Sequence, residues 1–355
     1  MDAVVLVGGE GTRLRPLTLS RPKPMLPLLG LPLIEYVLDR LASSGVTRVI
    51  FGCGYLPDPI ASHFGADWNG VALEYVVEPE PMGTAGGIRF AAHGRVKGTF
   101  LALNGDILAD APLADLVAHH RERGARATIA LTPVDDPSRY GLVRIAKGGS
   151  VLGFLEKPKI AEIDTNLINA GAYVLEPSVL DLIEHGRSVS IERETFPLLV
   201  GAGLFALEQG GYWSDVGTPV SYVAAHHDLL AGRIQSGLRS IDGSVVIEPG
   251  ARIASDAQLV APAYIAAGAS VAARAYVGAG STVADGASVG VGASISGAVL
   301  HEGASVGDGA TVAAAVVGRG ARIGAGSRIG ETALIGDGVE VPAGGVVADE
   351  QKVPG

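Results

Sequence analysis

The residues best suited to chemistry lie in a glycine-rich, basic segment at positions 5–24, VLVGGEGTRLRPLTLSRPKP. It contains the glycines Gly8, Gly9 and Gly11, followed by the cations Arg13, Arg15 and Lys23. Glycines let backbone N–H groups approach phosphate oxygens, and the cations neutralise the phosphate charge. The spacing matches neither the P-loop motif nor the dinucleotide-binding motif. The segment therefore predicts a site for a phosphate-bearing ligand of another kind.

Two carboxylates stand in contexts that could place them at such a site. Asp106 follows an apolar run and the pair Asn104-Gly105, and Asp215 lies in the string GYWSDVGTP. Phosphate transfer commonly uses magnesium held by carboxylates. Each aspartate also has a simpler explanation, because Asn-Gly is a common turn and Pro219 is typical of a helix start. On these residues alone, both interpretations stay open.

The bulk composition restricts the partners. The chain has 355 residues, of which 48% are hydrophobic and 18% charged, so it is long enough for two domains with full cores. A net charge of -10 argues against general binding to nucleic acid or to an anionic membrane. With Cys53 as the single cysteine and no leader-like start, we expect a cytoplasmic protein without an internal disulfide.

The first 230 residues alternate short apolar runs with helical spacing. The runs 4–7, 48–52, 73–77 and 100–103 predict buried strands, and the apolar spacing in 33–41 predicts a helix that Gly45 ends. This alternation predicts an α/β domain with a mainly parallel sheet. Ligands of such sheets bind at the carboxyl ends of the strands, and the basic segment follows one of those ends.

From about residue 245 the pattern changes to an aliphatic residue at every sixth position, with glycine and alanine filling most places between. This period is typical of a parallel β-helix. The aliphatic positions are Ile247, Ile253, Leu259, Ile265, Val271, Val277, Val283, Val289, Ile295, Leu300, Val306, Val312, Val317, Ile323, Ile329, Ile335, Val341 and Val347. The spacing falls to five at 295–300 and 312–317, which we interpret as shortened corners. We expect domains at 1–230 and 245–355, joined by a linker at 231–244.

The opening segment resembles the signature of sugar-nucleotide pyrophosphorylases, GGxGTRLxPLT followed by PK. Four further strings resemble family elements: GTAG at 83–86, FLEKP at 154–158, NAG at 169–171 and WSDVGTP at 213–219. The resemblance implies a Rossmann-like mixed, mainly parallel sheet in a nucleotidyltransferase domain, followed by a left-handed β-helix of hexapeptide repeats. It also implies an enzyme that joins a nucleoside triphosphate to a sugar-1-phosphate with magnesium, and a homo-oligomer.

The resemblance also implies roles for individual residues. Arg13, Lys23, Asp106 and Asp215 would be catalytic, with the two aspartates holding magnesium. The nucleotide would contact Leu6, Gly8, Gly9, Gly11, Thr12, Arg13, Lys23, Glu78, Gly83 and Asp106. The sugar phosphate would contact Gly141, Glu156, Lys157, Asn169 and Gly171.

Glu78 bears on which base is bound. A carboxylate only accepts hydrogen bonds, and guanine alone offers two adjacent donors on its pairing edge, so Glu78 favours GTP. Relatives that use uridine or thymidine nucleotides typically have glutamine there. The pattern is most similar to family members that join GTP to mannose-1-phosphate; thymidylyl or uridylyl transfer to glucose-1-phosphate is the alternative. Glu78 could instead face solvent, leaving Glu80 or backbone groups to choose the base.

Two other classes deserve weight. Many hexapeptide proteins are acyltransferases with a histidine base, and His301 is the single histidine within the repeats. A catalytically inactive regulatory subunit is the other possibility, but the retained cations and aspartates argue against it.

Overall fold

The computed structural model describes residues 1–155, 163–239 and 241–355. Packing divides the chain into two compact units. The first unit contains residues 1–9 and 36–213, and the second contains 10–35 and 214–355. Residues 10–35, called the loop segment below, thus belong with the C-terminal part of the chain. The domain limits expected at 230 and 245 stay a prediction.

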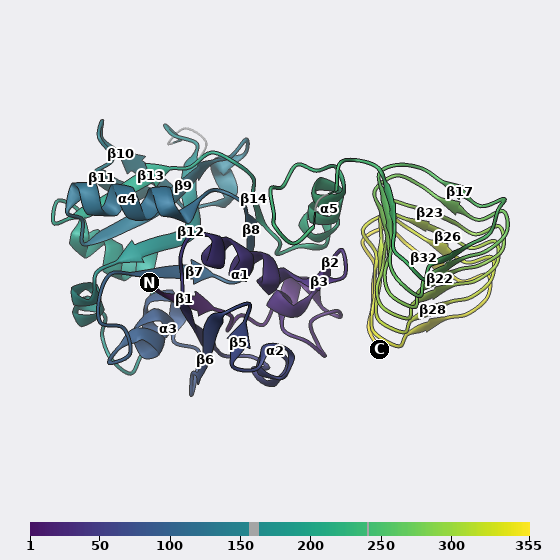
Figure 1. Cartoon of the computed structure of the whole chain (residues 1–355), viewed down its shortest axis with the longest axis horizontal. Helices are drawn as coiled ribbons and strands as arrows, with labels where there is room; N and C mark the ends of the chain where they lie inside the picture. Colours follow the sequence, from purple (N-terminus) through teal and green to yellow (C-terminus); the bar gives the residue numbers. More distant parts are fainter. Residues whose placement is uncertain (156–162, 240) are drawn as a thin grey trace. The chain divides into compact units, whose positions relative to one another are not determined.

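The first unit is built on a mixed sheet whose middle is parallel (Figure 1). The strand order is β11-β10-β12-β7-β1-β4-β6-β5, and β9 pairs with both β12 and β13. The parallel strands β7, β1, β4 and β6 match the expected apolar runs to within two residues at each end. The bounds are β1 (Asp2–Leu6), β4 (Arg48–Cys53), β5 (Asp67–Trp68), β6 (Val71–Val77), β7 (Phe100–Asn104), β8 (Ile107–Ala109), β9 (Ala127–Pro133), β10 (Leu142–Ile145), β11 (Val151–Leu155), β12 (Leu167–Leu175) and β13 (Leu204–Glu208).

Helices connect these strands. The expected helix at 33–41 is α1 (Leu33–Ser43), which begins in one unit and ends in the other. Its residues Ile34, Val37 and Leu38 are buried, as the spacing predicted, and Gly45 follows with a φ of 80°. The other helices of this unit are α2 (Asp58–Phe64), α3 (Gly83–Ala92) and α4 (Leu113–Arg123), with short 3-10 or π turns at η3 (Pro137–Arg139), η5 (Pro177–Leu182), η6 (Ile191–Thr195) and η7 (Phe196–Leu199).

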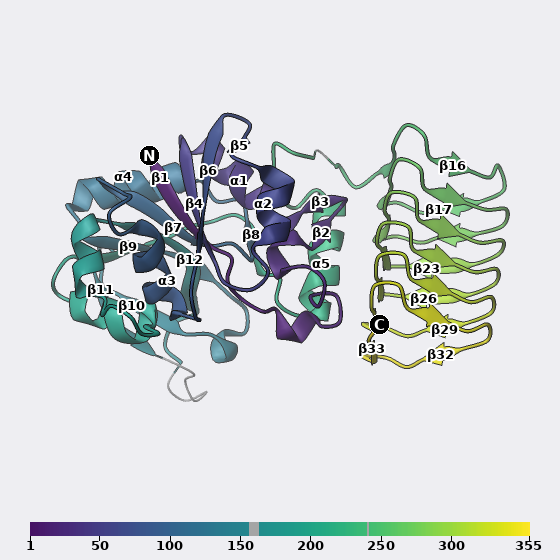
Figure 2. The same ribbon diagram turned by 90° about the horizontal axis from the view of Figure 1, so that it is seen from below.

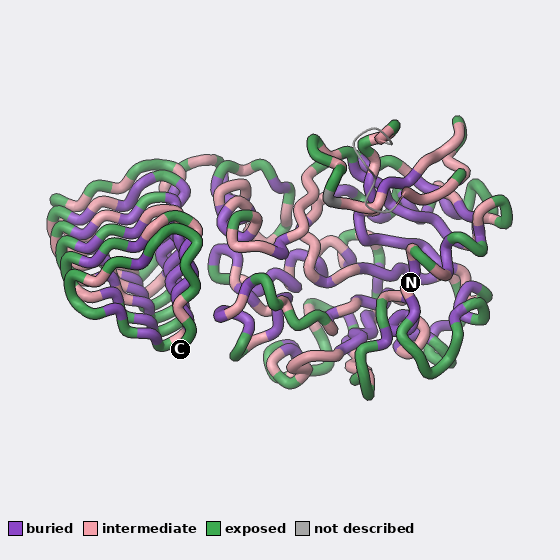
Figure 3. Tube along the Cα trace, turned by 180° about the vertical axis from the view of Figure 1, so that it is seen from behind, coloured by how far each residue is buried: buried purple, intermediate pink, exposed green. Residues whose placement is uncertain are grey.

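Burial follows the sheet, as Figure 3 shows for the central strands. The strand β12 departs from regular pairing: Asn169 faces Leu131, but Tyr173 faces Ile129, so extra residues are inserted into β12. Such a bulge bends a strand and redirects its side chains. The expected Asn-Ala-Gly element falls in this bulge.

The loop segment contains two 3-10 turns and a small hairpin. They are η1 (Thr12–Leu14), η2 (Lys23–Met25), β2 (Pro27–Leu28) and β3 (Leu31–Pro32). The strand β14 (Trp213–Asp215) leads into α5 (Pro219–Leu230). A capping box in which Thr218 and Ser221 exchange hydrogen bonds begins α5, with Pro219 in its first turn. No helix in the described ranges has the length and apolar character needed to cross a membrane.

The remainder of the second unit is the left-handed parallel β-helix that the sequence predicted, with coils stacked in three sheets (Figure 2). One sheet holds β15 (Val245–Ile247), β18 (Ala263–Ile265), β21 (Ser281–Val283), β24 (Val299–Leu300), β27 (Val316–Val317), β30 (Leu334–Ile335) and β33 (Lys352–Val353). The next holds β16 (Arg252–Ile253), β19 (Ser270–Val271), β22 (Ser288–Val289), β25 (Ser305–Val306), β28 (Arg322–Ile323) and β31 (Glu340–Val341). The third holds β17 (Gln258–Leu259), β20 (Tyr276–Val277), β23 (Ser294–Ser296), β26 (Thr311–Ala313), β29 (Arg328–Ile329) and β32 (Val346–Val347).

The six-residue period corresponds to the β-helix core. From Ile265 to Val347 the expected aliphatic residues are buried in one cluster. Ile247 is an exception, because it lies in the first coil with 48% of its surface exposed. Both shortened spacings fall at the same corner, before β24 and before β27, where Gly297 and Ala314 have positive φ values of 59° and 42°.

Candidate functional site

In the first unit, the ends of two neighbouring parallel strands form the floor of the candidate site. Leu6 pairs with Asn104, and the N–H of Gly105 donates to the carbonyl of Leu6 at 2.8 Å. A Cβ on Gly105 would lie 2.7 Å from a methyl group of Val7, so this close approach requires glycine. Backbone contacts therefore fix Asp106 beside the glycine turn that starts at Gly8.

Gly8 and Gly9 differ in their surroundings. A Cβ on Gly8 would lie 3.2 Å from the backbone nitrogen of Gly54, which follows strand β4. A Cβ on Gly9 would meet no atom within 4 Å, and Gly9 is exposed. Protein packing thus accounts for Gly8, whereas the expected backbone contact to phosphate gives a separate reason for Gly9.

The carboxylate of Glu78 turns toward the start of α3. Its Oε2 accepts a hydrogen bond from the N–H of Met82 at 3.1 Å, and a Cβ on Gly87 would lie 2.6 Å from its Oε1. Desolvation by burial raises the pKa of Glu78, and the Met82 hydrogen bond partly opposes that rise. The side chain is half-buried, so the alternative in which it simply faces solvent does not describe this structure.

Gly83 has a backbone reason to be glycine. Its φ is 68°, and a Cβ there would lie 2.7 Å from the carbonyl oxygen of Val189. The N–H of Ala85 donates to that same carbonyl at 2.9 Å. The beginning of α3 is thereby held against the segment that leads into η6.

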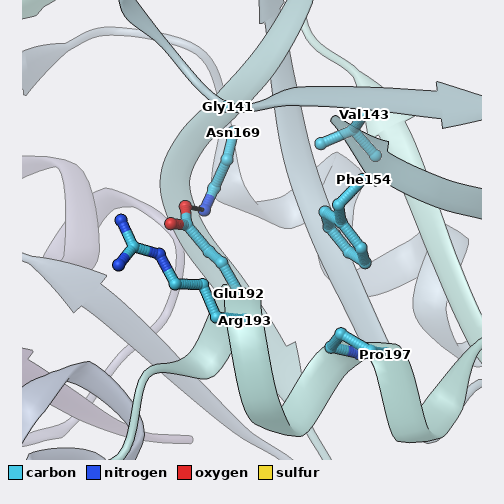
Figure 4. A pocket seen from close by; sticks show the side chains of 7 residues that line it. All are labelled: Gly141, Val143, Phe154, Asn169, Glu192, Arg193 and Pro197. Carbon is cyan, nitrogen blue, oxygen red and sulfur yellow. Dashed lines mark hydrogen bonds between the residues drawn. The ribbon is translucent and has the colours of Figure 1, made fainter. Parts of the chain in front are cut away.

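A pocket of about 250 Å³ lies in the same unit (Figure 4). Its lining residues are Gly141, Val143, Phe154, Asn169, Glu192, Arg193 and Pro197. Two of them, Gly141 and Asn169, are residues that the sequence assigned to the sugar phosphate. An apolar wall with a few polar groups is the usual make-up of a small-molecule site.

Internal hydrogen bonds orient the side chain of Asn169. Its Nδ2 donates to the hydroxyl of Tyr173 at 2.8 Å and to Oε1 of Glu192. Its Oδ1 accepts the N–H of Gly171 at 2.9 Å. Gly171 has a φ of 71°, and a Cβ there would lie 2.3 Å from Ile107 and 2.8 Å from Asn104. Gly171 therefore holds the bulge in place, beside the strand end that carries Asp106.

Sequence reasoning missed Glu192 and Arg193. Both lie in η6, a single π turn that Ser190 caps by accepting from the N–H of Arg193. Short π turns often mark functional sites, but periodicity does not reveal them in a sequence. The available signal was the local string SIERE, whose charges stand between buried residues.

In the second unit, Asp215 brings together the two expected phosphate-binding cations. Its Oδ1 accepts from Nζ of Lys23 at 3.1 Å, and its Oδ2 lies 3.6 Å from a guanidinium nitrogen of Arg13. A Cβ on Gly217 would lie 2.5 Å from that guanidinium, so glycine permits the approach. Lys23 is buried at 5% exposure, whereas the Arg13 side chain is 64% exposed.

The glycine-rich turn places Arg13 on η1. Gly11 adopts a φ of 60°, where a Cβ would crowd Thr18 and Lys23, and its carbonyl accepts from the Thr18 hydroxyl at 2.9 Å. Thr12 then begins η1 and is exposed. Gly11, Thr12, Arg13, Lys23 and Asp215 therefore belong to one packed arrangement.

Asp106 in the first unit and Asp215 in the second each offer carboxylate oxygens, the ligand type that hard divalent cations take. Within the described ranges, no three His, Cys, Asp or Glu side chains gather into a metal site of their own. The expected sugar-phosphate residues Glu156 and Lys157 lie outside the described residues.

Comparison with known proteins defines the class. The family described as nucleotidyl transferase matches residues 2–232, and the family described as GMPPB C-terminal domain matches residues 259–354. The chain belongs to the nucleotidyl transferase family, within the sugar-nucleotide pyrophosphorylases, as its motifs predicted. Nucleotidyltransferases of this family generally use a divalent metal.

Individual relatives are more specific. The chain is 43% identical to a mannose-1-phosphate guanylyltransferase of Mycobacterium tuberculosis, over 73% of each chain. It is 40% identical to a mannose-1-phosphate guanyltransferase of Eremothecium gossypii, over 72% of this chain and 73% of the relative.

Solved structures support the fold. A UDP-glucose pyrophosphorylase of Acinetobacter baumannii superposes with a TM-score of 0.61 at 23% identity, over 67% of this chain and 95% of the other. A structure described as a putative glucose-1-phosphate thymidylyltransferase of Bacillus anthracis superposes with a TM-score of 0.59 at 26% identity, over 67% of this chain and 97% of the other.

Proposed function

We propose that this protein transfers a guanylyl group from GTP to mannose-1-phosphate, giving GDP-mannose and pyrophosphate. The observation that carries the proposal is that two cations, Arg13 and Lys23, meet at Asp215. Arg13 follows directly after the glycine turn. The relatives named mannose-1-phosphate guanylyltransferase support this choice of substrates.

In this reaction a phosphate oxygen of mannose-1-phosphate attacks the α-phosphorus of GTP. The bond from that phosphorus to the bridging oxygen breaks, and the electron pair leaves with pyrophosphate. Catalysis of such a step depends on alignment and on neutralising charge. Arg13 and Lys23 would exchange Asp215 for triphosphate oxygens and stabilise the departing pyrophosphate.

Asp106 and Asp215 would hold magnesium, which when bound supplies neutralisation of the phosphate charge. Once its two cations engage the nucleotide, Asp215 has both oxygens available for that role. The backbone at Asp106 is already held, because the neighbouring Gly105 donates a hydrogen bond to the carbonyl of Leu6.

Glu78 would recognise guanine through its carboxylate. One oxygen accepts from Met82, but a carboxylate has about four acceptor sites and can accept from N1–H and N2–H as well. Changing Glu78→Gln replaces one acceptor with a donor, so kcat/KM for GTP relative to UTP or dTTP should fall about tenfold, the equivalent of one good polar contact. Glu80→Gln is the matched control, since Glu80 is exposed. An unchanged preference in the Glu78 variant would refute this role.

Mannose-1-phosphate would bind in the pocket of Figure 4. Asn169 and Glu192 present an oriented amide and carboxylate to sugar hydroxyls, and Arg193 adds a cation near the sugar phosphate. Gly141 lines the same pocket and has no side chain to fill it. Glu156 and Lys157 are further expected contacts from their motif.

The proposal is tested by measuring pyrophosphate release from five nucleoside triphosphates, each with mannose-1-phosphate and with glucose-1-phosphate. We expect magnesium-dependent release to be fastest with GTP and mannose-1-phosphate. Faster release with dTTP or UTP and glucose-1-phosphate would establish the alternative instead.

Two expectations from the sequence accompany this proposal. We expect a cytoplasmic protein, which fractionation of the producing cells would check. We also expect a homo-oligomer, formed through the β-helix, the catalytic domain or both. Light scattering of the purified protein would measure its mass against the 36.0 kDa of one chain.

A further inference from the structure

We propose that the last coils of the β-helix position the loop segment for nucleotide binding, with Asp337 and Lys352 as positioning residues. This inference rests on the proposed function, because it assigns a role to the segment that carries Arg13 and Lys23. All of these residues belong to the second unit.

The first contact is made to the backbone of Arg13. The Nζ of Lys352 donates to the backbone carbonyl of Arg13 at 2.6 Å. In the preceding coil, a Cβ on Gly336 would lie 3.2 Å from Pro16. That coil therefore packs closely against the loop segment. The β-helix thus holds the backbone of the residue whose side chain meets Asp215.

The second contact lies between Arg13 and Lys23. Oδ2 of Asp337 accepts from the hydroxyl of Ser20 at 2.7 Å and lies 3.8 Å from the guanidinium of Arg21. Asp337 and Arg21 side chains are each 18% exposed. Because both side chains are partly buried, solvent and salt screen their charges less than they screen an exposed pair. The contact therefore restrains the loop segment more firmly than a surface ion pair would.

Asp337 also has a role inside the β-helix, which supplies a control. Its Oδ1 accepts the N–H of Arg319 in the preceding coil at 2.8 Å. Asp308 makes the same contact to Val291 at 2.8 Å, and Asp349 makes it to Glu331 at 2.9 Å. Among these three aspartates, Asp337 is the one that also contacts the loop segment in the described part of the chain, through Ser20 and Arg21.

A third contact fastens the far end of the loop segment. The carbonyl of Pro27 accepts from the hydroxyl of Tyr222 and from Nε2 of His226 at 3.1 Å. Tyr222 in turn meets Nε2 of His301 at 3.0 Å, and His226 meets Thr282 at 3.1 Å. The loop segment is therefore held at Arg13, between Arg13 and Lys23, and after Lys23, where the contact runs through α5 to the β-helix.

The role predicts that loosening the contacts weakens nucleotide binding selectively. In Asp337→Asn, Oδ1 remains for Arg319, while the group facing Ser20 and Arg21 becomes a donor. We expect KM for GTP to rise about three- to fivefold, which corresponds to losing about 0.7–1 kcal/mol. KM for mannose-1-phosphate should change less than twofold. Lys352→Met should raise KM for GTP about threefold, and Lys352→Arg should restore it, because a guanidinium can also donate to the Arg13 carbonyl.

The controls are Asp308→Asn and Arg328→Met, which alter the β-helix without touching the loop segment in the described structure. A general loss of β-helix stability would affect Asp308→Asn and Asp337→Asn alike. Equal KM values for GTP in Asp337→Asn and Asp308→Asn would overturn the proposal.

Hydrogen exchange in the ligand-free protein separates this inference from the proposed function. The amides of Leu14, Arg15 and Leu17 donate within the loop segment. Their exchange should be faster in Asp337→Asn and Lys352→Met than in the controls. Unchanged exchange would overturn the positioning role even if the wild type uses GTP. If the wild type fails to use GTP, the proposed function fails. The exchange experiment still tests the positioning role in that case: faster exchange in the variants supports it, and unchanged exchange refutes it.

Discussion

The two units hold their candidate site residues by different means. In the first unit, backbone hydrogen bonds and close glycine contacts fix Asp106, Asn169 and Gly171. In the second unit, side-chain charges hold Arg13 and Lys23 on Asp215. Backbone contacts preorganise a surface, whereas ion pairs can exchange partners when an anion arrives. The comparison indicates a rigid floor in one unit and a set of exchangeable cations in the other.

The largest expected effect comes from the two aspartates, one in each unit. Asp106→Asn and Asp215→Asn should each lower kcat about 100-fold or more, since removing one group from an electrostatic site costs about 10²–10³. Circular dichroism should stay near wild type, because asparagine retains the shape of each side chain. The thermal stability of Asp215→Asn should fall, because buried Lys23 loses the charge that it faces. The matched control is Asp349→Asn. Near-normal rates in both variants would show that neither aspartate serves the metal.

The next effect tests the rigid floor. Gly171→Ala adds a Cβ 2.3 Å from Ile107 at a φ of 71°. The strain and crowding should lower the free energy of unfolding by about 2–4 kcal/mol, measured by urea denaturation. Gly98→Ala is the control, because a Cβ there meets nothing within 4 Å. A stable Gly171 variant with unaltered activity would mean that the bulge need not be rigid.

A smaller effect separates packing from ligand contact. Gly9→Ala adds a Cβ into open space and leaves φ in an ordinary region, so the free energy of unfolding should change by less than about 1 kcal/mol. If phosphate approaches this backbone, KM for GTP should rise about tenfold. Unaltered GTP kinetics would remove Gly9 from the nucleotide site.

The last effect is small at neutral pH and grows in acid, and it concerns the second unit. Burial lowers the pKa of His226 and of His301 to about 3. The groups that face them include Tyr222, His227, Arg21 and Arg319. Below the unfolded pKa near 6.5, the unfolded chain takes up protons that the folded chain excludes, so stability present at pH 7 is lost as pH falls.

Each of these histidines should contribute a loss of roughly 1 kcal/mol per pH unit between pH 6 and 4. Urea denaturation of the whole chain at several pH values measures the slope. The double variant His226→Gln, His301→Gln should have a flatter slope than wild type. An equal slope would show that these histidines do not limit acid stability.

The sequence predicted what depends on local pattern. The apolar runs located the parallel strands, and the six-residue period located the β-helix core from Ile265 onward. Ile247 was misplaced inside the core, because nothing in the period distinguishes the open first coil from the covered coils. The family motifs were recognisable because glycines and charges stand at fixed spacings.

The sequence did not predict what depends on distant residues meeting. Arg13 and Asp215 are about 200 positions apart, and the union of residues 10–35 with the β-helix has no local signature. The role of His301 was also hidden: it is buried against Tyr222 rather than exposed as an acyltransferase base would need to be. Glu192 and Arg193 were missed because a single π turn leaves no periodic pattern.

The most direct test of the proposed reaction is a competition of two substrate pairs in one magnesium-containing assay, with both products identified by mass spectrometry. We predict that GTP with mannose-1-phosphate yields GDP-mannose at least about tenfold faster than dTTP with glucose-1-phosphate yields its product, the discrimination that one good polar contact supplies. Equal or faster formation of the thymidine sugar nucleotide would contradict the assignment of Glu78 and of the substrate pair.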